Sequence, residues 1–288
     1  MLLGLEIQTW LALTGVAAVI STLGSLFGLV LKEVVFTRSF ESWKQEKILE
    51  KIYEKYRDPI ILAARELCIR LHNILEDFPP SFLTSEVLRS SPTKQTDNST
   101  EDPYFRKHML TSTSYRVCAF LGWIELYRQE LVFLDSGRAE HTRALEKCID
   151  SIRGDFADGQ LNTADNWEEW TDNPIAREEL RAIGEVMLVR SADGSGIMGY
   201  AQFCEQLETR EKTSFQRWVA TTNNLLLDLE DDGADFRKVR SQRLVGHLLD
   251  LLELLDDKPL GDHLIDLRKA HAADRTSSPA KPSTKATV

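Results

Sequence analysis

Residues 7–31 form a continuous run without a charged side chain, and this run constrains the fold more than any other part of the sequence. A transmembrane helix needs about 20 mostly apolar residues, because each residue rises about 1.5 Å and the hydrocarbon core is about 30 Å thick. The run therefore predicts one retained helix that spans a lipid bilayer. A cleaved signal peptide is the alternative, but its apolar core is shorter and follows basic residues, whereas only Glu6 is charged before this run.

Basic residues are unevenly distributed around the expected span. No Lys or Arg precedes it, and Lys32, Arg38, Lys44, Lys47, Lys51, Lys55 and Arg57 follow it. The positive-inside rule then predicts an N-terminus outside and a C-terminal domain in the cytoplasm. A glycosylation sequon at residues 98–100 is available for modification only if the domain is lumenal or extracellular, so we expect it to be an accidental match.

Small residues share one face of the expected span: Ala17, Ser21, Gly24 and Gly28. Gly24 and Gly28 form a G-x-x-x-G pattern, which lets two helix backbones approach closely. This face is a candidate for homodimerisation through the transmembrane helix. The alternative is that glycine and serine are simply common in such helices.

Charge and length limit the functions open to the chain. Its 288 residues, 42% of them hydrophobic, are enough for one globular domain and at most two. The net charge is −10, with 45 acidic and 35 basic side chains. Because nucleic-acid binding depends on clustered Lys and Arg, we do not expect nucleic acid as a partner.

The cysteines and histidines do not indicate a metal or cofactor site. The 4 cysteines are widely spaced in apolar or helical segments, as in a reduced cytosolic domain. Cys68 and His72 stand one helical turn apart, but two ligands without a third favour core packing over zinc. None of the 6 histidines lies in a hydrolase or metalloprotease motif, and we expect no cofactor.

The remaining chain shows helical periodicity, which predicts an all-α fold with a helical-bundle domain. Residues 1–36 are the expected anchor, 37–57 a charged helical stalk, 58–271 the bundle with a mobile loop at 78–102, and 272–288 a disordered tail. Asp58-Pro59 is expected to end the stalk helix and begin a core helix at 59–76. Further helices are predicted at 104–134, 138–152, 174–189, 200–212, 215–229 and 236–255.

Two tryptophans lie in the polar connection at residues 154–173. Trp167 and Trp170 flank two glutamates and are candidates for docking a partner, because aromatic side chains anchor many interfaces. The alternative is that they fold back over their own core.

A G-x-G-x-x-G pattern occurs at Gly194, Gly196 and Gly199. A dinucleotide site needs this pattern directly after a strand, within a βαβ unit that continues downstream. Four residues separate the apolar segment ending at Val189 from the first glycine. We therefore predict a glycine-rich turn between helices, in which at least one of these glycines has a backbone conformation that alanine resists.

Acidic residues at 228–233 resemble the start of an EF-hand loop. The positions that should supply the ninth and twelfth residues are Phe236 and Val239, and neither is a calcium ligand. We predict a solvated helix end there instead of a calcium site.

The sequence is most consistent with a single-pass membrane protein that acts as an interaction or regulatory module at the cytoplasmic face. Its expected partners are the bilayer, a second copy of the chain and an unidentified protein. A membrane-tethered enzyme of unrecognised class is the alternative, with a pocket expected around His72, His108 or His141. A third hypothesis is a membrane effector that oligomerises through Gly24 and Gly28.

Overall fold

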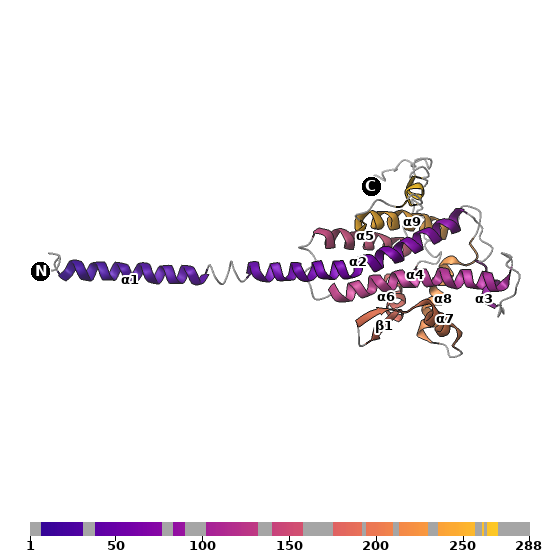
Figure 1. Ribbon diagram of the computed structural model, residues 1–288, viewed down its shortest axis with the longest axis horizontal. Coiled ribbons are helices and arrows are strands. Elements are labelled where there is room, and N and C mark those ends of the chain that lie inside the picture. Colours follow the sequence, from indigo (N-terminus) through magenta and orange to yellow (C-terminus); the bar gives the residue numbers. More distant parts are fainter. Residues whose placement is uncertain are drawn as a thin grey trace, which may run out of the picture. The chain divides into compact units, whose positions relative to one another are not determined.

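A computed structural model describes residues 7–30, 38–76, 83–89, 102–131, 140–157, 175–191, 194–209, 213–229, 236–256, 261 and 264–269. The chain divides into two compact units, Met1–Lys51 and Ile52–Val288. Most described residues are helical, and the strands among them form one two-stranded antiparallel sheet. The prediction of a largely helical chain with one apolar N-terminal helix is therefore confirmed (Figure 1).

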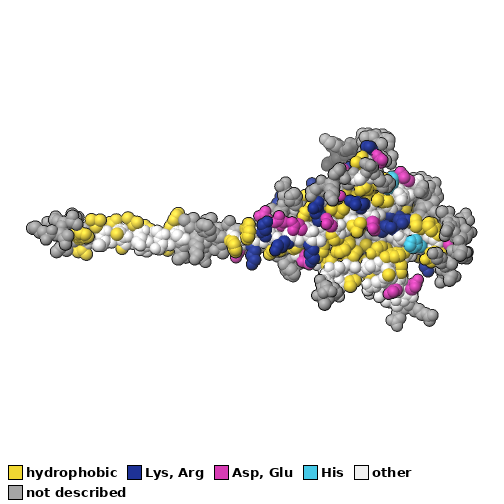
Figure 2. Space-filling model, viewed as in Figure 1, with side chains coloured by type: hydrophobic (Ala, Val, Ile, Leu, Met, Phe, Trp, Pro, Cys, Tyr) yellow, Lys and Arg dark blue, Asp and Glu magenta, His cyan; other side chains and the backbone are white. Residues whose placement is uncertain are grey.

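The first unit contains α1 (Ile7–Val30), which is long and apolar enough to cross a membrane over Trp10–Gly28. None of the side chains in that stretch is buried. Figure 2 shows hydrophobic and uncharged side chains along the described part of α1, and interleaved acidic and basic side chains on the first turns of the next helix.

Three hydroxyl groups of α1, those of Thr14, Thr22 and Ser25, donate hydrogen bonds to backbone carbonyls of the same helix. Thr22 donates a hydrogen bond to the carbonyl of Ala18 at 2.7 Å, and Ser25 donates one to the carbonyl of Ser21 at 2.9 Å. Such bonds remove the penalty of placing a hydroxyl in hydrocarbon, where water is absent. The polar residues of α1 are thus compatible with a membrane span.

Helix α2 (Arg38–Glu76) is continuous through Pro59, so the predicted break at this proline is wrong. Proline removes one backbone hydrogen bond and is unfavourable inside an isolated helix. Here the turns on both sides are held by tertiary contacts, because Tyr56 and Ile60 are almost fully buried. Burial of the apolar face outweighs the local preference for a helix start.

The second unit is built around α4 (Pro103–Leu131). Helices α5 (Glu140–Ala157) and α9 (Phe236–Leu255) pack against each other, and α6 (Arg177–Val186) packs along α4. Figure 1 shows α5 and α9 along one side of α4, with α7 (Tyr200–Glu208), α8 (Ser214–Leu226) and the sheet along the other. The core is mostly aliphatic and lies between these helices.

The leucines of α9 belong to this core. Leu244, Leu248, Leu251 and Leu255 are all buried, as expected for an ordinary core helix. Within unit two, Arg57 Nε of α2 donates to the carbonyl of Leu255 at 2.6 Å, and Arg65 pairs with Asp256 at 3.1 Å. These bonds attach α2 to the end of α9, where the last helical carbonyls lack intrahelical partners.

Part of the expected mobile loop at 78–102 is helical. Helix α3 (Ser85–Arg89) lies inside it, with Leu83 and Val87 buried. The sequence did not predict this helix, because polar residues surround its short apolar segment. Within that loop, the structure describes only residues 83–89 and 102. The expected tail at 272–288 lies outside the described residues.

Candidate ligand-binding groove

The four small residues of the predicted span all lie within helix α1. Ala17, Ser21, Gly24 and Gly28 are all exposed, and a methyl group added at Gly24 or Gly28 would meet no atom within 4 Å. The surface is thus open to a second helix, and dimerisation stays a prediction. Trp167 and Trp170 lie outside the described residues.

The glycine-rich pattern belongs to a β-hairpin, so the predicted interhelical turn is wrong in its secondary structure. Strand β1 (Leu188–Ser191) pairs antiparallel with β2 (Gly194–Ile197). A dinucleotide fold needs parallel strands joined by a crossover helix, and this hairpin joins strands directly. Gly194 has φ of +139°, which confirms that one of these glycines has a conformation that side chains resist.

The EF-hand-like acids begin with a residue that has a structural role. Asp228 has φ of +50°, and its Oδ1 accepts a hydrogen bond from the backbone N–H of Ser85 at 2.9 Å. Its own N–H donates to the carbonyl of Leu83 at 2.8 Å. Asp228 therefore joins the end of α8 to the start of α3.

The candidate metal pair is used for packing and local bonding. Cys68 is buried, and burial raises the pKa of its thiol to about 12. His72 Nε2 lies 2.8 Å from Glu76 Oε1, one turn further along α2. Within the part of the chain that the structure describes, no three ligand-type side chains converge on a metal position.

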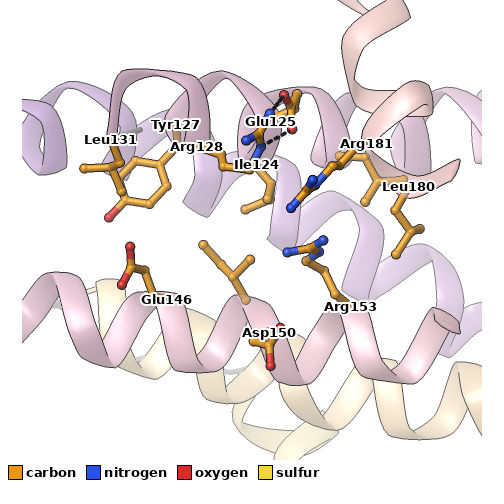
Figure 3. Close-up of a pocket in the computed structure, with 12 residues that line it drawn as sticks. Ile124, Glu125, Tyr127, Arg128, Leu131, Glu146, Asp150, Arg153, Leu180 and Arg181 are labelled. Atoms are coloured by element: carbon orange, nitrogen blue, oxygen red, sulfur yellow. Dashed lines mark hydrogen bonds and ion pairs between the residues drawn. The ribbon is translucent and has the colours of Figure 1, made fainter. Parts of the chain in front are cut away.

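A groove of about 490 Å³ lies between α4, α5 and α6, wholly inside the second unit (Figure 3). This volume is in the range typical of small-molecule sites, about 300–1,000 Å³. Its walls combine leucine and isoleucine side chains with six charged ones. The charged residues are Glu125, Arg128, Glu146, Asp150, Arg153 and Arg181.

A close contact between α4 and α6 defines one wall. A methyl group on Gly184 would lie 2.7 Å from the Leu121 carbonyl oxygen and 2.7 Å from Glu125 Cβ. Only glycine permits this approach, because real carbon atoms do not come so near. The close approach of α6 to α4 beside the groove thus depends on the absence of a side chain at Gly184.

Arg128 is already neutralised by a carboxylate. Its Nε and Nη2 lie 2.7 Å and 2.5 Å from the two oxygens of Glu125, which is only 3% exposed. Gln129 donates a third hydrogen bond to the same carboxylate at 3.0 Å. These bonds raise the pKa of Arg128 and leave neither group available for a ligand without rearrangement.

Arg153 and Arg181 differ from Arg128 in having no ion-pair partner among the described residues. Figure 3 shows their guanidinium groups pointing toward each other from α5 and α6. Desolvation lowers the pKa of Arg153, and the positive charges of Arg181 and Arg177 lower it further. Asp150 opposes this shift, but it pairs with Arg177 at 2.6 Å.

The other end of the groove carries Tyr127 and Glu146. Tyr127 Oη is buried and meets no partner of normal hydrogen-bond geometry in the described part of the chain. Burial raises the pKa of Tyr127, the Glu146 and Tyr53 charges add to the shift, and the Thr142 side chain opposes it. The groove is therefore cationic at one end and has a phenol and a carboxylate at the other (Figure 3).

The sequence did not indicate this site. A weak signal exists, since Arg177 and Arg181 stand four residues apart on one helix with Leu180 beside them. Nothing in the sequence shows that Arg153 on α5 faces them. The histidines named as pocket candidates, His72 and His108, do not line the groove, and the side chain of His141 lies outside the described residues.

No protein-family model, curated protein sequence or solved structure matches this chain. The fold and the groove define a helical protein with one apolar N-terminal helix and a charged interhelical groove.

Proposed function

We propose that this chain is a single-pass membrane protein whose helical domain binds another protein, or a second copy of itself, at the cytoplasmic face. The observation that carries the proposal is the exposed apolar stretch Trp10–Gly28. A soluble protein rarely leaves so large a contiguous apolar surface in water. Insertion of this helix into lipid is the simplest way to remove its apolar surface from water.

The proposed orientation rests on the charges that follow the span. Lys44, Lys47 and Lys51 lie early in α2, and basic residues near a span favour the cytoplasmic side. The cysteines agree with this orientation, since Cys68, Cys118, Cys148 and Cys204 are all free thiols. A reducing compartment maintains thiols in that state.

Aromatic residues further support a membrane-proximal position for the start of α2. Phe40 is 63% exposed and Trp43 is 54% exposed, and their rings stack with centroids 5.9 Å apart. Exposed tryptophan is favoured at the boundary between lipid and water, where its ring is solvated by both. Trp10 near the start of α1 is suited to the opposite boundary.

The test is an affinity purification from membranes in mild detergent, comparing the full chain with a variant that lacks residues 1–36. The proposal expects a stoichiometric macromolecular partner, either another protein or a second copy, with the full chain. It expects weaker recovery without the anchor, because the membrane concentrates both partners. Recovery of the chain alone with a small molecule would contradict the interaction module and favour the tethered enzyme.

A further inference from the structure

The groove between α4, α5 and α6 holds two converging positive charges that form no ion pair with any described residue. Arg153 and Arg181 come from different helices, and their guanidinium groups face each other (Figure 3). Arg153 is half-buried and Arg181 is exposed. The charge of Arg181 lowers the pKa of Arg153, as expected for a like charge close to a partly desolvated group. The arrangement is unfavourable in the free protein and becomes favourable when an anion lies between the two groups.

Two of the three carboxylates that line the groove are already paired, and the third, Glu146, lies at the end away from the two arginines (Figure 3). Glu125 is engaged by Arg128 and Gln129, and Asp150 is engaged by Arg177. Each of these two carboxylates is therefore already paired with a side chain other than Arg153 or Arg181. The missing negative charge must come from outside the described residues.

We propose that this groove binds a small organic phosphomonoester, with its phosphoryl group between Arg153 and Arg181. A guanidinium donates two parallel hydrogen bonds to phosphate oxygens, and two guanidiniums match the charge of about −1.5 to −2 on a phosphoryl group. A diester carries a single negative charge and presents fewer free oxygens.

The apolar wall assigns the rest of the ligand. Ile124, Ile149 and Leu180 line the groove together with the arginines. They favour a ligand body of carbon over a bare inorganic ion, since burial of apolar surface stabilises by about 25 cal/mol per Å². The inference concerns the second unit alone and does not depend on membrane anchoring.

The first experiment titrates the full chain, in nanodiscs of zwitterionic phospholipid, with phenyl phosphate by calorimetry. We expect saturable binding with a dissociation constant on the order of 1 mM or below. Methyl phenyl phosphate, the matched diester, is expected to bind at least about tenfold more weakly. Equal affinity for the monoester and the diester would overturn the assignment.

Substitutions locate the site. Arg153→Gln and Arg181→Gln are each expected to weaken phenyl phosphate binding at least about tenfold, and Arg217→Gln is the matched control. Arg217 is exposed on α8 and lies over the Trp218 ring, away from the groove, so its loss removes the same charge without touching the site. An equal loss of affinity in the control would contradict the proposal.

Thermal unfolding without ligand separates binding from folding. Removing one of two repelling charges should leave the melting temperature unchanged or raise it. Arg181→Lys is a second variant, since it keeps the charge and loses the forked geometry, and it should retain the fold while losing part of the affinity. Full phenyl phosphate affinity in both Arg181 variants would overturn the role of this residue.

The phosphomonoester can come from a soluble compound or from a lipid headgroup. Nanodiscs that contain phosphatidic acid, a lipid with a terminal phosphomonoester, are compared with phosphatidylglycerol nanodiscs of the same surface charge. Arginine-dependent preference for phosphatidic acid assigns a lipid source, and arginine-dependent binding of phenyl phosphate alone assigns a soluble one. Loss of arginine dependence in both arms would refute the site.

Discussion

At the residue scale, two buried tyrosines show how a single hydroxyl group depends on its surroundings. Tyr56 and Tyr127 pack edge to face with ring centroids 6.1 Å apart. Tyr56 Oη donates to Glu130 Oε1 at 2.9 Å, and Lys55 Nζ donates to the same oxygen at 2.9 Å. Tyr127 Oη is buried and meets no partner of normal hydrogen-bond geometry in the described part of the chain. The two hydroxyls should therefore affect stability in opposite directions.

We predict that Tyr127→Phe leaves the free energy of unfolding unchanged or raises it by about 1 kcal/mol, because it removes an unsatisfied buried hydroxyl. Tyr56→Phe is the matched control and should lower it by about 1 kcal/mol, since the bond to Glu130 is lost. Urea denaturation of the full chain in detergent micelles measures both. A destabilised Tyr127→Phe variant would show that this hydroxyl has a strong partner.

His247 gives the stability a dependence on pH. The hydrogen bond that protonated His247 Nδ1 donates to Asp155 Oδ2, with the two atoms 2.5 Å apart, raises the pKa of His247, and burial opposes this shift. A raised pKa in the folded state means that the stabilisation is complete below the ordinary value of 6.5. It is lost as pH rises through the higher, folded-state pKa.

Stability of the wild type should thus fall between about pH 6 and pH 8 by more than that of His247→Gln. The difference should be below about 1 kcal/mol, because solvent screens a histidine whose side chain is 37% exposed. Unfolding midpoints measured across this pH range test the sign. If stability depends on pH in the same way in both proteins, His247 does not cause the dependence.

At the element scale, the contact of α6 with α4 is limited by Gly184. We predict that Gly184→Ala lowers the free energy of unfolding by about 1–3 kcal/mol, because the new methyl group would overlap the Leu121 carbonyl oxygen. This clash should exceed the helix propensity that alanine adds. Gly196→Ala is the control, since open space surrounds that position. Denaturant melts should separate the two variants clearly.

The helices were predictable where apolar residues recur over several turns. Helices α4, α8 and α9 lie within a few residues of their predicted ranges, because their long periodic patterns determine which face is buried. The hairpin was missed because strands of four residues carry little periodicity. The continuity of α2 through Pro59 depends on burial, which local sequence does not reveal.

At the scale of the whole molecule, the groove was not predictable. Its cationic end joins Arg153 and Arg181, which belong to different helices with a long polar connection between them. Sequence spacing specifies neighbours within one helix, whereas neighbours on different helices depend on packing. The apolar N-terminal helix was predictable, since its length and composition are local properties.

The face of Ala17, Ser21, Gly24 and Gly28 yields a prediction about assembly. If two chains pair through it, a variant with both Gly24→Leu and Gly28→Leu should show several-fold less dimer, because leucine prevents close approach of the helices. Gly15→Leu is a control, since it lies on the opposite face of α1. Native mass spectrometry from detergent can measure the dimer fraction. A monomeric wild type would contradict this hypothesis.

The central claim is a retained single span with the helical domain in the cytoplasm, and the chain carries its own reporter of orientation. Residues 98–100 form a glycosylation sequon beyond the span. We propose translating the full chain with microsomes, with a second sequon added before Met1. The account predicts a full-length chain that resists carbonate extraction, with sugar on the added sequon and none on Asn98. Glycosylation of Asn98, cleavage of the anchor or release by carbonate would contradict it.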